Sequence, residues 1–106
     1  APAERELSAP TTSAVYVRSA RIVGRRIAGE YVLVPLVTHG ADLDAIYNLN
    51  AVGAFIWERL DGSRSGTQIV SDLTETFAVE VAQAQADYLE FVGRLQALGA
   101  VEPAGG

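Results

Sequence analysis

The first half of the chain contains short apolar runs bounded by turn-forming residues, a pattern typical of β-strands. Two runs rich in β-branched residues, Ile22 to Ile27 and Tyr31 to Leu36, flank a glycine at position 29. A glycine between two such runs favours a tight turn, because it adopts a positive φ without steric cost. The pattern therefore predicts a β-hairpin with its turn at Gly29.

A third strand is expected after the hairpin. Pro35 cannot donate to a strand ladder, so we expect it at a strand end or at a bulge. Residues 38–42 carry turn-forming Gly and Asp, and the short run from Asp44 to Leu49 then predicts the last strand of a three-stranded antiparallel meander. The single histidine, His39, lies in this second turn without a spaced partner, which favours an exposed turn residue over a catalytic one.

The second half of the chain changes to a helical period and predicts three helices. The first runs from about Ala51 to Leu60, after Asn50, whose side chain can accept from the opening amides. The second opens with the capping box at residues 65–68, Ser-Gly-Thr-Gln. The third runs from about Val81 to Leu98 and ends at Gly99, which suits a left-handed C-cap. A three-stranded antiparallel β-sheet followed by three α-helices is an α+β fold of the winged helix-turn-helix type.

Composition indicates one domain with a single core. The chain has 106 residues, of which 49% are hydrophobic, and this suits one compact unit. Residues 1–14 mix Pro, Ser, Thr and charged residues without a period, and residues 103–106 read Pro-Ala-Gly-Gly. We therefore expect a disordered N-terminal arm over residues 1–14, a domain over residues 15–102 and a flexible tail over residues 103–106.

Charge and residue usage exclude several classes of function. The net charge is −5, and the acidic excess lies in residues 50–106, which opposes binding to duplex nucleic acid through Lys and Arg. Without cysteine and with one histidine, the chain offers no disulfide framework, thiolate site or zinc cluster, so we expect no metal, no cofactor and no catalytic residue. The chain has no run of about 18 apolar residues, the length needed to span a membrane. Residues 1–14 lack the pattern of a signal peptide, so we expect a cytoplasmic protein.

The third predicted helix carries an unusually wide apolar face. Its main stripe steps by three and four residues along Val81, Ala84, Tyr88, Phe91, Leu95 and Leu98. Leu89 and Val92 extend the apolar arc to roughly 180° at about 100° per residue. This width fits either a broad core contact or a face shared between the core and an apolar ligand in an adjacent groove. Asp87 and Arg94 border the stripe, either as solvated charges or as contacts for polar groups of a ligand.

The third predicted strand offers an open edge to a ligand. A strand at the end of a meander leaves one row of N–H and C=O groups unpaired, and such an edge accepts an extended peptide by β-augmentation. The candidate edge residues are Asp44, Ala45, Ile46, Tyr47 and Asn48. The first strand is the alternative edge, but charge protects it against stray pairing. The arginines that crowd it are Arg18, Arg21, Arg25 and Arg26.

The residues around the first predicted helix resemble the signature of a known family. Residues 49–62 read LNAVGAFIWERLDG and match the LN-x-x-G-x-x-IW-x-x-x-DG pattern of the PqqD-like proteins. Residues 25–34 match the upstream strand pair of this family, R-x-x-x-GE-x-VLV. The family pattern continues downstream at Ser65, Ile69, Val70, Leu73, Phe77, Val79, Asp87, Phe91, Leu95, Gly99 and Val101. The resemblance covers residues 20 to 102 or so.

The resemblance implies a function in peptide recognition. PqqD-like proteins, also called RiPP recognition elements, are small winged-helix domains that bind the leader segments of ribosomally made precursor peptides and present them to modifying enzymes. It implies a non-catalytic peptide chaperone that captures a leader by β-strand addition along residues 44–48. Its partners would be the leader peptide and a maturation enzyme, for example of the radical SAM class, with no nucleic acid and no membrane, and the chain would be a monomer or a weak homodimer. The helical wall of the site would comprise Ala84, Asp87, Tyr88, Phe91, Arg94 and Leu95.

The sequence is compatible with two other functions. The same elements form winged-helix DNA-binding regulators, which place a helix in the major groove, although acidic residues outnumber basic ones over residues 65–98. An open strand edge beside an apolar helix also suits a protein–protein docking or dimerisation module, in which two copies exchange strands. Trp57 lies on an apolar helical stripe, which favours a core residue over an exposed stacking platform.

Overall fold

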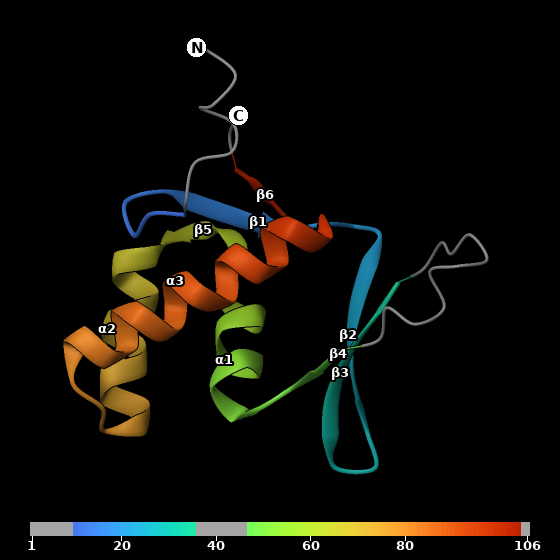
Figure 1. Cartoon of the computed structure of the whole chain (residues 1–106), viewed down its shortest axis with the longest axis horizontal. Coiled ribbons are helices and arrows are strands. Elements are labelled where there is room, and N and C mark those ends of the chain that lie inside the picture. Colours follow the sequence, from blue (N-terminus) through green and yellow to red (C-terminus); the bar gives the residue numbers. More distant parts are fainter. Residues whose placement is uncertain (1–9, 36–46, 105–106) are drawn as a thin grey trace.

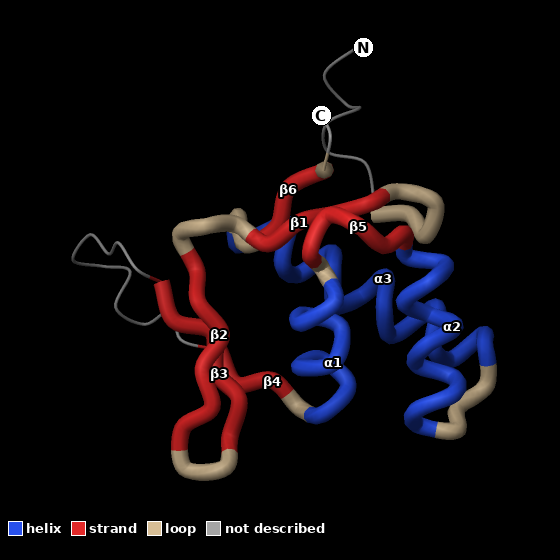
Figure 2. The backbone as a smooth tube through the Cα atoms, turned by 180° about the vertical axis from the view of Figure 1, so that it is seen from behind, coloured by secondary structure: helices blue, strands red, loops and turns tan. Residues whose placement is uncertain are grey.

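The computed structural model describes residues 10–35 and 47–104, and its helices pack beside two small sheets (Figure 1). The elements in chain order are β1 (Val15–Arg18), β2 (Ile22–Ile27), β3 (Glu30–Pro35), β4 (Tyr47–Leu49), α1 (Ala51–Arg59), β5 (Asp61–Ser65), α2 (Gly66–Phe77), α3 (Val81–Leu98) and β6 (Val101–Pro103). The meander β2-β3-β4 stands to one side of the helices, while β5-β1-β6 lies across one end of them (Figure 2).

The meander and its hairpin confirm the sequence-based expectation. β2 and β3 pair antiparallel, and β4 pairs antiparallel on the other side of β3. The turn between β2 and β3 uses φ angles of 53° at Ala28 and 85° at Gly29, so both central residues have the positive φ that tight hairpins favour. Pro35 is the last residue of β3, opposite Ile22, as expected for a residue without an N–H.

The second sheet, β5-β1-β6, was not predicted. β1 lies between its partners, pairing with β5 at Val15 opposite Ser65 and with β6 at Arg18 opposite Val101. Arg18 is therefore not a guard on the edge of the meander: its Nη1 donates to the Trp57 and Glu58 carbonyl oxygens at 3.0 Å each. These carbonyls lie in the last turn of α1, where carbonyl groups run out of helical N–H partners; the Trp57 carbonyl also accepts from Leu60 N at 3.2 Å. Arg18 thus ties the second sheet to the end of this helix.

Residues just outside the predicted domain bounds of 15 and 102 also pair with the fold. Within the expected arm, the carbonyls of Thr12 and Ala14 accept from Thr67 N at 2.8 Å and Gly66 N at 3.2 Å, so residues 12–14 belong to the fold. Within the expected tail, Pro103 is part of β6 and Ala104 N donates to Val15 O at 2.9 Å. The composition of these segments is typical of disorder, but a neighbouring strand and a helix N-terminus satisfy their backbone groups.

The three helix caps expected from the sequence are present in the structure. Asn50 Oδ1 accepts from Gly53 N at 2.8 Å, which caps α1. Ser65 and Gln68 form the reciprocal capping box of α2, and Gly99 closes α3 with a φ of 72°. The capping prediction is confirmed at all these positions, because each cap depends only on residues within one turn of the helix end.

The core lies between the three helices and is reached by both sheets. Trp57 is only 2% exposed, which confirms its prediction as a core residue. Its indole lies against the backbone of β2, because a Cβ built on Gly24 would stand 2.6 Å from Trp57 Nε1. Leu33 brings the meander into the same cluster. The core cluster comprises Tyr16, Leu33, Ile56, Trp57, Leu60, Ile69, Val70, Leu73, Ala84, Tyr88, Val92, Leu95, Ala100 and Val101.

Candidate functional site: the groove between β4 and α3

β4 is an edge strand of the meander as the structure describes it. In the order β2-β3-β4, its only strand partner within residues 10–35 and 47–104 is β3. The pairing is Tyr31 with Leu49, Val32 with Asn48 and Leu33 with Tyr47. Because N–H and C=O groups alternate in direction along an antiparallel strand, part of the β4 backbone points away from β3. This edge has the geometry needed to accept another strand.

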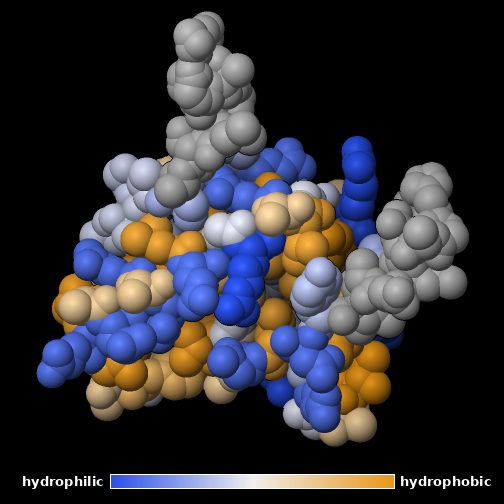
Figure 3. Space-filling view, viewed as in Figure 1, coloured by the Kyte–Doolittle hydropathy of each residue, from blue (hydrophilic) through white to orange (hydrophobic). Residues whose placement is uncertain are grey.

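An apolar pocket lies between this edge and the C-terminal half of α3. It has a volume of ≈ 280 Å³. Tyr47 is 43% exposed and Leu98 is 36% exposed at its rim, so large apolar surface is open to a partner. The apolar surface near the end of α3, toward the meander, is visible in the space-filling view (Figure 3). The pocket is lined by Leu33, Tyr47, Asn48, Leu49, Phe91, Arg94, Leu95, Ala97 and Leu98.

A second, more polar pocket adjoins the first. Its volume is ≈ 250 Å³, and it shares Asn48, Leu49, Phe91 and Arg94 with the apolar pocket. α1 contributes to it through its N-terminus, where Gly53 allows close approach: a Cβ there would stand 3.3 Å from Phe91 Cε1. The residues lining the polar pocket are Asn48, Leu49, Asn50, Val52, Gly53, Asp87, Glu90, Phe91 and Arg94. We call the two pockets together the β4–α3 groove.

Charged groups of α3 line the polar pocket. Arg94 Nη2 lies 3.0 Å from Glu90 Oε2, and the two side chains are 71% and 67% exposed; such a pair contributes little to stability because water screens it. Asp87 is half-buried, and its Oδ1 accepts from Gln83 Nε2 at 2.8 Å. The Asp87 carboxylate therefore has a neutral hydrogen-bond donor as its neighbour on the helix.

The structure brings together about half of the residues predicted for the site. Those that line the groove are Tyr47, Asn48, Asp87, Phe91, Arg94 and Leu95. Asp44, Ala45 and Ile46 lie outside the described residues.

Ala84 and Tyr88 lie in the core, with exposed fractions of 1% and 0%, and neither lines the two pockets of the groove. Tyr88 points toward α2, where its Cε2 would meet a Cβ on Gly66 at 2.6 Å. The core therefore takes the stripe through Ala84, Tyr88, Val92 and Leu95.

Sequence reasoning missed several lining residues. The adjacent stripe of α3, through Asp87, Phe91, Arg94 and Leu98, steps by four and three residues and faces the groove. This stripe was visible in the sequence as a second helical row beside the core row. The α1 residues had no such signal, because they reach the groove only through the crossing of α1 and α3. The missed residues are Leu33, Leu49, Asn50, Val52, Gly53, Glu90, Ala97 and Leu98.

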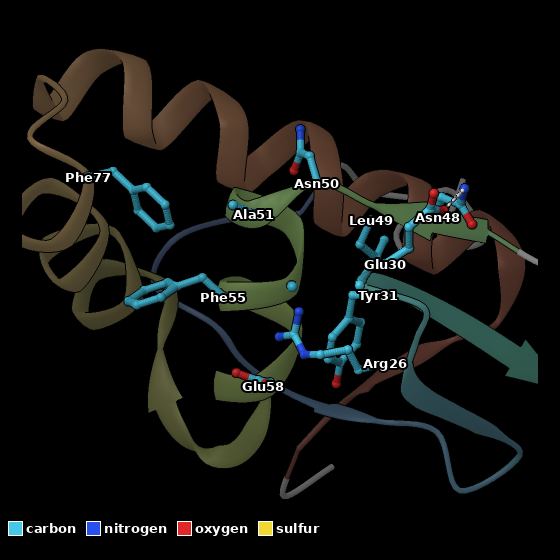
Figure 4. A pocket seen from close by; sticks show the side chains of 12 residues that line it. Arg26, Glu30, Tyr31, Asn48, Leu49, Asn50, Ala51, Phe55, Glu58 and Phe77 are labelled. Atoms are coloured by element: carbon cyan, nitrogen blue, oxygen red, sulfur yellow. Dashed lines mark hydrogen bonds between the residues drawn. The ribbon is translucent and has the colours of Figure 1, made fainter.

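A larger cavity, ≈ 480 Å³, lies on the other side of β4, between the hairpin, α1 and the end of α2 (Figure 4). Many of its polar and aromatic groups already contact each other. Phe55 meets Phe77 edge to face with ring centres 5.4 Å apart. Asn48 Nδ2 donates to Glu30 Oε1 at 3.0 Å. Volume alone favours this cavity, but the β4–α3 groove combines exposed apolar side chains with a strand edge that has no second partner among the described residues.

Neither a metal cluster nor a membrane-spanning helix is found among the described residues. In the part of the chain that the structure covers, no three His, Cys, Asp or Glu side chains gather in a way that could hold a metal ion. Among the helices described, none is long and apolar enough to cross a membrane.

Comparisons with known proteins agree with this fold. The sequence model described as "Coenzyme PQQ synthesis protein D (PqqD)" matches residues 30–101. A solved structure of TbiB1 in complex with the TbiA(beta) leader peptide is 24% identical with a TM-score of 0.66, over 81% of this chain and 94% of that one. A lasso peptide synthetase B1, complexed with the leader peptide, is 23% identical with a TM-score of 0.69, over 85% of this chain and 100% of that one. Among curated protein sequences, none matches this chain.

Proposed function

Because this chain belongs to the PqqD family, we propose that it is a non-catalytic peptide-binding protein that captures the leader segment of a ribosomally made precursor peptide. The leader adds as a strand beside β4 and rests on α3, and a modifying enzyme then receives the precursor from this complex. The observation that carries the proposal is the open edge of β4 beside the β4–α3 groove. The two solved structures that share the fold are both complexes with leader peptides.

The edge and the groove have complementary tasks in this mechanism. Main-chain hydrogen bonds to β4 hold any extended peptide, because they do not depend on its side chains. Each such bond contributes only about 0.5–1.5 kcal/mol after exchange with water. Burying one large aliphatic or aromatic side chain in the apolar pocket adds about 1.5–3 kcal/mol. The edge therefore supplies general affinity, while the pockets beside Phe91 select the sequence.

The groove offers binding groups rather than catalytic ones. Its ionisable lining residues are Tyr47, Asp87, Glu90 and Arg94. None of these is paired with a nucleophile and a base in the way that acyl or phosphoryl transfer needs. Chemical modification of the precursor is therefore assigned to a separate maturation enzyme, for which a radical SAM protein is one candidate.

The charge on α3 disfavours the DNA-binding alternative. α3 would be the recognition helix of a winged helix-turn-helix protein. Its groove-facing charges are Asp87, Glu90 and Arg94, and Glu90 is already paired with Arg94. Affinity for duplex DNA rests on several Lys or Arg contacts to phosphates, which this face does not supply.

The proposal is tested with synthetic peptides of about 20 residues, tiled along the short reading frames that flank the gene. Fluorescence anisotropy should find one peptide that binds with a one-to-one stoichiometry. Duplex fragments from the same locus serve as the comparison, and binding of DNA without binding of any peptide would contradict the proposal.

Strand addition itself is tested by proline substitution at two neighbouring positions. Since successive N–H groups alternate in direction, one of Tyr47 and Asn48 directs its N–H toward the open edge. Proline at that position should leave the fold intact and weaken peptide binding, because it removes only a donor to the peptide. Tyr47→Thr and Asn48→Thr are the matched controls, since they change the same side chains and retain the N–H. Equal binding by all four variants would exclude strand addition at β4.

A further inference from the structure

The composition of the β4–α3 groove suggests which leaders it accepts. Resting on the proposed function, we propose that the groove reads two leader side chains spaced two residues apart: a large apolar side chain in the apolar pocket and a cationic side chain, Lys or Arg, beside Asp87. Asp87 is then a specificity-determining residue.

The two walls of the groove change character in the same direction. On the strand side, Tyr47 lines only the apolar member of the groove, whereas Asn50 lines only the polar one. On the helix side, Ala97 and Leu98 line the apolar pocket, whereas Asp87 and Glu90 line the polar one. A peptide lying along β4 therefore passes from an apolar environment to a charged one.

The spacing of the pockets fits a strand. Tyr47 and Leu49 pair with Leu33 and Tyr31, so they lie two residues apart on the same face of the meander. Side chains on one face of an added strand also recur every two residues, at about 6.8 Å. The α3 residues that line the apolar pocket have a mean position four to five residues further along the helix than those that line the polar pocket. At a rise of about 1.5 Å per residue, the two pockets are about 7 Å apart along α3. One same-face side chain of the peptide thus reaches each pocket.

The charge of the polar pocket favours a cation. Glu90 already has a cationic neighbour in Arg94, with 3.0 Å between their charged atoms. Asp87 accepts from the neutral Gln83 amide, and no Arg within the described ranges lies within 4.0 Å of its carboxylate. Because Asp87 is half-buried at the groove wall, its charge is screened less than that of a fully exposed carboxylate. A Lys or Arg side chain complements this charge, whereas an Asp or Glu side chain is repelled by it.

The order of the two leader residues reports the direction of the added strand. β4 runs from the apolar pocket toward the polar one. A parallel leader would carry its apolar residue two positions before its basic residue, and an antiparallel leader would carry the basic residue first.

The test is a selection from a displayed library of random peptides of about 12 residues on the wild-type chain, on Asp87→Asn and on Asp87→Lys. The wild type should enrich peptides with a large apolar residue and a Lys or Arg two positions away. Asp87→Asn should retain the apolar preference and lose the basic one, and Asp87→Lys should favour an acidic residue at that position. Glu75→Gln, an exposed change on α2, is the matched control and should select as the wild type does.

Individual peptides from the selection give the magnitude. Replacing the selected Lys by Gln should weaken binding to the wild type by about two- to fivefold, as expected for a partly exposed ion pair, and by less than about twofold to Asp87→Asn. Because Asp87→Asn keeps the side-chain shape, it also answers the question if Asp87→Lys does not fold.

The outcomes separate the two levels of the proposal. Peptides that shift the amide signals of β4 and α3 but show no preference for a basic residue, or prefer an acidic one, would overturn the role of Asp87 and leave peptide binding intact. Failure to enrich any peptide that binds at β4 and α3 would overturn the proposed function as well.

Discussion

A single methyl group added at Gly24 should destabilise the protein, although alanine is usually the better residue within a strand. Gly24 lies in β2, where a Cβ would stand 2.6 Å from Trp57 Nε1 and 2.6 Å from both Cε1 and Oη of Tyr31. Trp57 is 2% exposed and held in the core, so its ring cannot move aside without disturbing α1. The contact is where the meander carrying β4 meets the helices.

The expected magnitude follows from two opposing effects. Overpacking a well-filled site costs about 1–3 kcal/mol. Replacing glycine by alanine within a strand stabilises the protein by about 0.5–1 kcal/mol, because alanine loses less conformational freedom on folding. The net loss should lie between about 0 and 2.5 kcal/mol, centred near about 1 kcal/mol, and the melting temperature should fall by about 4–8 °C for each kcal/mol.

Gly93→Ala is the matched control for this substitution. Gly93 lies within α3, and the nearest atom to a Cβ there is Pro10 Cγ at 3.8 Å, an ordinary contact. The same chemical change should therefore stabilise the protein by about 0.5–1 kcal/mol. Urea unfolding followed by the fluorescence of Trp57, the only tryptophan, measures both variants. A Gly24→Ala variant as stable as Gly93→Ala, with unchanged fluorescence, would refute the packing of the indole against β2.

Three further predictions concern the core and the titrating groups. Trp57→Ala should lose about 3–5 kcal/mol in urea unfolding followed by circular dichroism, a large part of the stability of a small domain; a loss below about 1 kcal/mol would contradict the core assignment. Tyr88→Phe should be as stable as the wild type or more so, because the buried Tyr88 hydroxyl makes no hydrogen bond among the described residues. Burial raises the pKa of Tyr88 from 10.0 to about 12. The stability of the wild type should therefore hold below pH 10 and fall toward pH 12, because the Tyr88 hydroxyl loses its proton in the unfolded chain before it does so in the folded one. The stability of Tyr88→Phe should fall less over the same pH range. The Ser63 hydroxyl donates to Asp61 at 2.7 Å and lowers the pKa of that carboxyl below 3.8; Ser63→Ala should raise it in a carboxyl NMR titration, and an unchanged midpoint would exclude this cause.

The sequence predicts well those elements that depend on neighbouring residues. The hairpin at Gly29, the cap at Asn50 and the capping box at Ser65 each need only a few adjacent positions. The sheet β5-β1-β6 could not be predicted in this way. β5 reads Asp-Gly-Ser-Arg-Ser, which has no strand propensity, and β6 has three residues. Both become strands because β1 satisfies their backbone groups from a distant part of the chain.

The sequence predicts that α3 lines the site but not which of its side chains do so. A helix with a wide apolar arc has two adjacent stripes, and sequence periodicity does not show which stripe faces the core. In α3 the stripe through Tyr88 is buried and the stripe through Phe91 lines the groove. The contribution of Gly53 depends on its close approach to Phe91, which is a property of helix crossing and not of local pattern.

The central claim is that a leader peptide binds along β4 and against α3. Its most direct test is an NMR titration of isotopically labelled protein with the flanking-gene peptide that binds in the anisotropy assay. Amide shifts should concentrate at residues 47–49 of β4 and residues 87–98 of α3, with the N–H groups on the open edge of β4 gaining protection from hydrogen exchange. Shifts confined to β2, at residues 22–27, with β4 and α3 unchanged, would place the peptide on the opposite edge of the meander and contradict the account.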